Sequence, residues 1–114
     1  MREPDDFDFT PRKVEKAGEL EAVAWAEMND WLVRKMQYEG RAGAPDRIFY
    51  GHGHIVLIEM KREKVRNHKD GGLSKGQVEE HKRIREHGCE VHVAYTAEEA
   101  IAILRRHMSN SLLV

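Results

Sequence analysis

Residues 43–61 decide how this chain folds, and they read Gly-Ala-Pro-Asp-Arg-Ile-Phe-Tyr-Gly-His-Gly-His-Ile-Val-Leu-Ile-Glu-Met-Lys. Two apolar runs, 47–50 and 55–61, stand on either side of Gly51-His52-Gly53-His54, and glycines permit the positive φ angles of a tight turn. The stretch therefore predicts a hairpin of two antiparallel strands. The second run is apolar on both faces, which is typical of a strand in the middle of a sheet.

Further strands and helices are expected on both sides of this hairpin. Pro11 suits a helix start, Ser74 and Thr96 open sequences of the capping-box type, and Gly88 is a typical helix stop. The expected helices are 11–29, 74–87 and one from 96 onward, and the expected strands are 31–37, 47–50, 55–61 and 90–95. The order is α-β-β-β-α-β-α, which predicts an α/β fold: a mixed sheet of about four strands flanked by helices, with the last two strands parallel or near neighbours.

The composition suits a single small domain. The chain has 114 residues, of which 40% are hydrophobic and 34% charged. We expect a flexible acidic arm over residues 1–10, the domain over 11–107, and a tail over 108–114. No apolar run approaches the roughly 20 residues of a membrane span, and the acidic N-terminus does not resemble a secretory signal. Cys89 is the single cysteine, which excludes a disulfide framework and favours a reducing, cytoplasmic setting.

Charge is unevenly distributed along the chain. The formal net charge of -1 argues against bulk attraction to nucleic acid. Residues 61–75 are nevertheless locally basic, because Lys and Arg outnumber Glu63 and Asp70 there. The basic residues are Lys61, Arg62, Lys64, Arg66, Lys69 and Lys75. Such a patch can follow a phosphate backbone. The alternative is a solvated loop whose lysines serve solubility, and charge alone favours that loop.

Three polar residues are expected to meet at one end of the hairpin. Glu59 and Lys61 point to the same side of their strand because strand side chains alternate. Asp46 follows Pro45 and begins the first hairpin strand, so an antiparallel pairing places it beside the end of the second strand. Each residue alone is explained by an exposed ion pair or a turn. Two carboxylates beside a lysine, however, suit a hard divalent cation such as Mg²⁺.

Gln77 and the first helix offer further candidates. Ser74 and Gln77 fit a Ser-x-x-Gln capping box, and a helix start near a phosphate would also let Gln77 contact an anion. Glu15, Glu19 and Glu21 are carboxylates of the first helix, and any of them could face the sheet end or belong to a solvated acidic face.

A transition-metal site made of histidines is a second possibility. His52 and His54 are the only close pair among seven histidines, and no third ligand is evident, so we expect them to be exposed in the turn. The helical histidines His81, His87 and His107 are expected at the surface, and Cys89 is expected to be packed.

These pieces in this order resemble the VRR-NUC (virus-type replication-repair nuclease) family, a branch of the PD-(D/E)xK nucleases. The matching residues are Asp30-Trp31-Leu32-Val33, Gly43-Ala44-Pro45-Asp46, Glu59-Met60-Lys61, Leu73-Ser74 with Gln77, and Gly88 with the strand 91–95. The resemblance covers residues 14–105. Ala44 departs from it, since a larger β-branched residue is common there, but this is a packing position.

The resemblance implies a restriction-endonuclease-like core and divalent-metal-dependent cleavage of DNA. Asp46 and Glu59 would then be metal ligands, with the backbone carbonyl of Met60 as a third. Lys61 would be the catalytic lysine, and Gln77 would lie near the lysine and the scissile phosphate. Mg²⁺ is the implied cofactor, and Mn²⁺ is expected to support activity as well.

The resemblance also implies roles for residues at positions that match the family. The family's glutamate on the first helix falls on Glu19, which would hold a ligating water or a second metal ion, and Glu15 is the alternative. The nuclease domain would be residues 11–107. The residues expected to contact the DNA backbone are Arg62, Lys64, Arg66, Lys69, Ser74 and Lys75.

The implied partner is branched DNA. Small stand-alone proteins that the chain resembles are phage or prophage proteins of the bacterial cytoplasm, which pair as homodimers and resolve four-way (Holliday) junctions. Trp25 and Met28, or the tail 112–114, are candidate interface residues. The alternatives are a nicking or flap-type nuclease and a non-catalytic nucleic-acid-binding module on the same fold.

Overall fold

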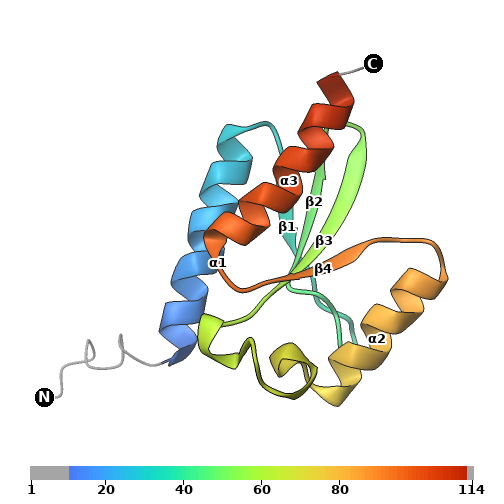
Figure 1. Ribbon diagram of the computed structural model, residues 1–114. Coiled ribbons are helices and arrows are strands. Elements are labelled where there is room, and N and C mark those ends of the chain that lie inside the picture. The colour runs from blue at the N-terminus through green and yellow to red at the C-terminus, as the bar shows by residue number, and fades with distance from the viewer. Residues whose placement is uncertain (1–10, 113–114) are drawn as a thin grey trace, which may run out of the picture.

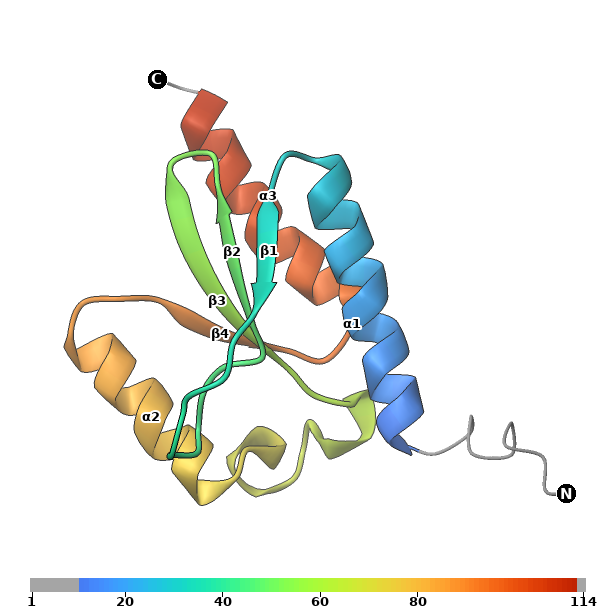
Figure 2. The same ribbon diagram turned by 180° about the vertical axis from the view of Figure 1, so that it is seen from behind.

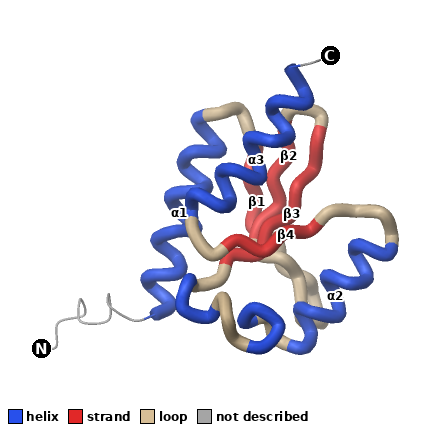
Figure 3. Tube along the Cα trace, viewed as in Figure 1, coloured by secondary structure: helices blue, strands red, loops and turns tan. Residues whose placement is uncertain are grey.

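The computed structural model describes residues 11–112, and the side chains of residues 18–108 (Figures 1 and 3). In chain order the elements are α1 (Pro11–Met28), β1 (Leu32–Lys35), β2 (Arg47–Gly51), β3 (His54–Met60), η2 (Glu63–Val65), η3 (Lys69–Gly72), α2 (Lys75–Glu86), β4 (Val91–Ala94) and α3 (Ala97–Leu112). The predicted order and α/β class are confirmed. The basic loop after β3 differs from the expectation in containing two short 3₁₀ turns.

The sheet has the order β1-β2-β3-β4. β1 and β3 both pair antiparallel with β2, while β3 and β4 are parallel. The hairpin turn consists of His52 and Gly53, whose φ angles of 53° and 80° are both positive, as a two-residue turn that matches the strand twist requires. The predicted hairpin and the inner position of β3 are therefore confirmed.

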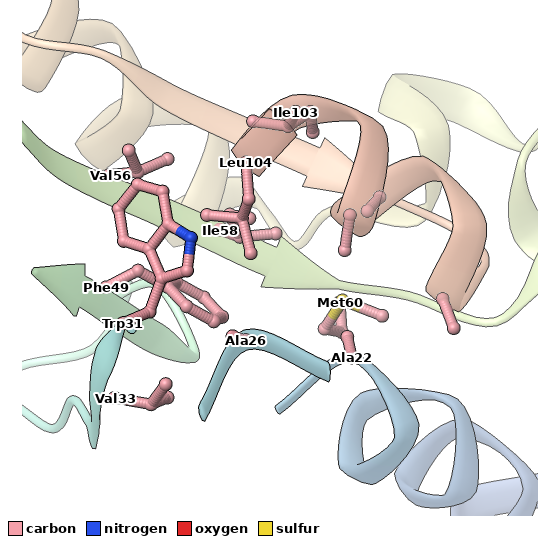
Figure 4. Packing of buried hydrophobic residues seen from close by; sticks show 13 residues of the cluster. Ala22, Ala26, Trp31, Val33, Phe49, Val56, Ile58, Met60, Ile103 and Leu104 are labelled. Carbon is pink, nitrogen blue, oxygen red and sulfur yellow. The ribbon is translucent and has the colours of Figure 1, made fainter. Parts of the chain in front are cut away.

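One face of the sheet forms the core with α1 and α3. The two helices lie together on that side of the sheet in both opposite views (Figures 1 and 2). Alternation along β3 turns Val56, Ile58 and Met60 to this face, where Figure 4 shows them clustered with Phe49 and Leu104. Each such side chain contributes about 1.5–3 kcal/mol by leaving water. The core thus fixes the hairpin, and with it the end of β3.

Several predictions of exposure are wrong. His52 is partly buried, because a ring nitrogen lies 2.9 Å from the carbonyl oxygen of Asn29 and its ring packs on Trp31. His107 is buried because α3 turns it toward the sheet, where its ring centroid lies 4.9 Å from that of the partly buried His54. Cys89, expected to be packed, is exposed, because it lies in the loop before β4 begins.

Two further expectations concern the ends of the chain. The proposed arm, residues 1–10, and the last two residues of the tail, 113–114, lie outside the described residues. Within the described part of the chain, no helix is both long enough and apolar enough to cross a membrane.

Candidate active site

Asp46 and Glu59 meet at the open end of the hairpin. Arg47 pairs with Ile58 in the β2–β3 register, so the next position along each strand brings Asp46 opposite Glu59. The backbone N–H of Met60 donates to Asp46 Oδ2 at 2.8 Å, and Glu59 is close enough to affect the pKa of the Asp46 carboxyl group. The predicted convergence of the two acids is confirmed.

The loop before β2 holds Asp46 in place by packing against α2. Gly43 has a φ of 102°, and a Cβ atom there would lie 2.8 Å from the carbonyl oxygen of Gly76 in the first turn of α2. Glycine is therefore required both for the backbone angle and for the close approach. Pro45 is buried and fixes the chain direction immediately before Asp46.

Lys61 joins the two acids from the end of β3. Its Nζ lies 4.0 Å from Glu59 Oε2, and its side chain is partly buried. The Lys61 backbone N–H donates to the carbonyl oxygen of Ala94 at 2.9 Å, which extends the pairing with β4 by one residue. Met60 points the other way, into the core, as the alternation predicts.

Gln77 links the start of α2 to Glu59. The Ser74 hydroxyl accepts from the Gln77 N–H at 3.1 Å, and the Gln77 side chain accepts from the Ser74 N–H at 2.9 Å, so the predicted capping box is confirmed. The Gln77 amide Nε2 also donates to Glu59 Oε2 at 3.1 Å. The same side chain therefore caps the helix and orients the acid.

Glu19 lies near the two acids but has a partner of its own. Its carboxylate forms an ion pair with Arg47, and both side chains are largely buried. Its negative charge is still close enough to raise the pKa of Asp46. Of the other helix-one carboxylates, Glu21 is exposed, and the side chain of Glu15 lies outside the described ones.

His81 is a residue of the site that the sequence did not reveal. It was expected at the surface, but it is only 1% exposed, and its Nε2 lies 4.0 Å from Glu59 Oε1. It follows Gln77 by four residues, so the two share one face of α2. That spacing from the capping glutamine is the signal that could have identified it. His87, at the end of the same helix, is exposed as predicted.

The surroundings of Asp46 raise the pKa of its carboxyl group. Burial is the main cause that raises the pKa of Asp46, and Glu19 adds to it, while the Met60 N–H, Glu59 and Lys61 act in the opposite direction. The carboxylates are hard oxygen ligands of the kind that Mg²⁺ prefers. Among the described residues, no group of three His, Cys, Asp or Glu side chains is placed to hold a metal ion. Two carboxylates are a donor set that suits Mg²⁺, which takes few protein ligands, and they do not match the four Cys or His ligands of a structural zinc site.

Some basic residues of the loop after β3 form ion pairs within the fold, and others are exposed. Arg66 pairs with Glu63 and Glu99, and its guanidinium lies 4.6 Å from the centre of the Tyr95 ring, so it holds the loop against α3. The Thr96 hydroxyl accepts from the Glu99 N–H at 3.1 Å, which confirms one of the two hydrogen bonds of the predicted capping box. The Glu99 side chain, however, accepts from the N–H of Tyr95 and not from that of Thr96. The exposed lysines of the loop and of the start of α2 are Lys64, Lys69 and Lys75. Arg62 is partly buried, and Ser74 is used as the helix cap.

Comparison with known proteins decides the family. A solved structure described as "VRR_NUC domain" superposes with a TM-score of 0.68 and 30% sequence identity, over 80% of this chain and 94% of that one. The chain belongs to the VRR-NUC family. No family model matches its sequence, and no curated protein does. The VRR-NUC assignment agrees with the mixed four-stranded sheet and flanking helices of a restriction-endonuclease-like fold. It supports a nuclease-type fold and a nucleic-acid substrate.

Proposed function

We propose that this VRR-NUC domain is a divalent-metal-dependent DNA endonuclease that hydrolyses phosphodiester bonds. The observation that carries the proposal is the convergence of Asp46, Glu59 and Lys61 at the end of β3, beside Gln77. A protein that only binds nucleic acid gains nothing from two carboxylates beside phosphate, because like charges repel there. A hydrolase needs them to hold a cation.

Asp46 and Glu59, with the backbone carbonyl of Met60, are the residues that would hold Mg²⁺ or Mn²⁺. A divalent cation so bound supplies polarisation of the phosphodiester and lowers the pKa of a coordinated water. Lys61 places a positive charge beside Glu59, where it can orient the attacking water and offset the negative charge of the transition state. Gln77 fixes the orientation of Glu59, and Glu19, which Arg47 holds in place, puts a negative charge near Asp46.

The DNA backbone is proposed to lie along the basic loop and the start of α2. Lys64, Lys69 and Lys75 are exposed there, and Arg62 is next to the catalytic lysine in sequence. Arg66 is assigned a structural role instead, because two carboxylates engage it. Contacts of this kind bind phosphates without reading bases, so we expect strong salt dependence and little sequence preference.

A homodimer acting on four-way junctions is the form of this activity that we propose, in the cytoplasm of a bacterial host and with a phage or prophage origin. Two sites related by a two-fold axis suit a symmetric junction that needs two cuts. The exposed apolar side chains Leu32, Tyr50 and Ile55 form a row of register partners across β1, β2 and β3, which offers surface for a second copy.

The two interface candidates on α1 differ in exposure. Met28 is 83% exposed and remains available, whereas Trp25 is partly buried against the core and its ring lies beside Arg105. A dimeric mass in solution supports the junction proposal. A monomeric mass contradicts it and favours a nicking or flap-type nuclease.

An incubation panel tests the activity. Linear duplex, flap, splayed-arm and four-way junction DNA are each incubated with Mg²⁺, with Mn²⁺ and with chelator. We expect cleavage with either metal, none with chelator, and the fastest cutting on the junction. Binding of these substrates without cleavage under any metal condition would instead identify a non-catalytic binding module.

A further inference from the structure

His81 is a buried side chain next to the proposed site, and the proposed mechanism gives it no role. It lies on α2, one turn after Gln77, and is 1% exposed. Neither of its ring nitrogens makes a hydrogen bond within the described residues. Burying a polar group without such a bond costs about 1–3 kcal/mol, so an apolar side chain would suit the fold better unless the imidazole serves the site.

The imidazole faces the carboxylate of Glu59. His81 Nε2 lies 4.0 Å from Glu59 Oε1, while Gln77 and Lys61 approach the other oxygen, Oε2, at 3.1 Å and 4.0 Å. Glu59 is itself 2% exposed, so protein groups rather than water decide how its carboxylate is oriented. Polar neighbours therefore lie on both sides of this acid.

The distance of 4.0 Å is a contact and is longer than a hydrogen bond. A shift of about 1 Å in either side chain would bring the pair to hydrogen-bond distance. An imidazole nitrogen that carries a proton can donate a hydrogen bond to a carboxylate oxygen, so the two side chains are chemically complementary.

We propose that His81 is a positioning residue, which holds the Glu59 carboxylate in the orientation that binds a divalent cation. The proposal rests on the proposed function, since it requires a cation at Asp46 and Glu59. An aliphatic side chain at position 81 would replace a polar neighbour of the buried Glu59 carboxylate by an apolar one, which penalises the charged form. Groups that orient a metal ligand typically change metal affinity by about 10–100-fold when they are removed.

Three substitutions of His81, with one control variant, separate a positioning role from a packing role. His81→Leu removes the ring nitrogens while keeping an apolar side chain of moderate size. His81→Gln places an amide nitrogen near the position of Nε2, and His81→Asn places one near Nδ1, farther from Glu59. His87→Leu makes the same chemical change at the exposed end of α2 and serves as the control.

The test is isothermal titration of each purified protein with Mn²⁺, without DNA, alongside thermal unfolding in chelator. We expect His81→Leu and His81→Asn to bind Mn²⁺ about 10–100-fold more weakly than the wild type, and His81→Gln and His87→Leu to stay close to it. If His81→Leu does not fold, the contrast between His81→Gln and His81→Asn decides.

Failure of the role proposed for His81 is distinguishable from failure of the proposed function. A wild type that binds no Mn²⁺ contradicts the proposed function itself. A wild type that binds Mn²⁺ while the folded His81 variants bind it equally well overturns the role of His81 and leaves the proposed function intact.

Discussion

The two faces of the sheet differ in character: one carries the apolar core that stabilises the fold, and the other carries the polar candidate site. On the face covered by α1 and α3, Ile58 and Met60 are buried in an apolar core. On the opposite face, their neighbours Glu59 and Lys61 form the polar site with α2. One strand therefore serves both purposes by alternation, and substitutions one residue apart are expected to have separable consequences.

The largest expected effect is on the core face. Ile58→Ala removes a fully buried side chain from the middle of the sheet, and we expect it to lower the free energy of unfolding by about 2–5 kcal/mol. Chemical denaturation measures this loss. Arg34→Ala, on the other face of the sheet and exposed, is the control and is expected to change stability by less than about 0.5 kcal/mol. Equal losses in the two variants would remove the distinction between the faces.

On the site face, Lys61→Ala is expected to separate chemistry from stability. Single-turnover cleavage should slow at least about a hundredfold, because the transition state loses a nearby positive charge. Binding of DNA and the unfolding midpoint should change little. Lys64→Ala, an exposed lysine three residues away, should reduce binding slightly and leave the cleavage step unchanged. Full activity in Lys61→Ala would exclude the lysine from the mechanism.

A smaller effect distinguishes the two roles of Gln77. Ser74→Ala and Gln77→Ala each break the capping box, and each should cost about 1 kcal/mol of stability. Only Gln77→Ala also removes the amide that donates to Glu59. We therefore expect comparable unfolding midpoints in the two variants but slower cleavage in Gln77→Ala. Matching cleavage rates would show that Gln77 only caps the helix.

The smallest effect is expected where β4 meets α3, away from the site. Hydrogen bonding to His92 is the main cause that lowers the pKa of Glu90, and the charge of His107 contributes. A lowered pKa in the folded state means that the stabilisation exists above the ordinary value near 4.5 and is lost as the pH falls. Glu90→Gln should thus cost less than about 1 kcal/mol at neutral pH and almost nothing in acid, as denaturation at both pH values can check. A cost independent of pH would contradict this.

The sequence predicted the fold well because its signals are local. The hairpin turn at His52 and Gly53, the cap at Ser74 and the alternation of β3 each depend on adjacent residues, and all three are confirmed. The meeting of Asp46 with Glu59 followed from the same hairpin, since an antiparallel register places the two positions opposite each other.

What the sequence does not show are contacts between elements that are distant in the chain. The basic neighbours of Arg66 predict a contact with the DNA backbone, but its guanidinium forms an ion pair with Glu99 of α3. His81 and His107 were placed at the surface because helix periodicity does not show which face meets the sheet. Spacing predicts that Glu19 lies near the site, as the structure shows, but it does not predict the ion pair with Arg47, which depends on how α1 packs against β2.

The most direct test is the Mg²⁺ dependence of junction cleavage by the wild type and by Asp46→Asn, which keeps an oxygen to accept the Met60 N–H but removes the charge. We expect the wild type to cut in Mg²⁺ and to stop in chelator, and Asp46→Asn to bind the junction without cutting it at any Mg²⁺ concentration. Undiminished cleavage by Asp46→Asn, or by the wild type in chelator, would contradict a cation held between Asp46 and Glu59.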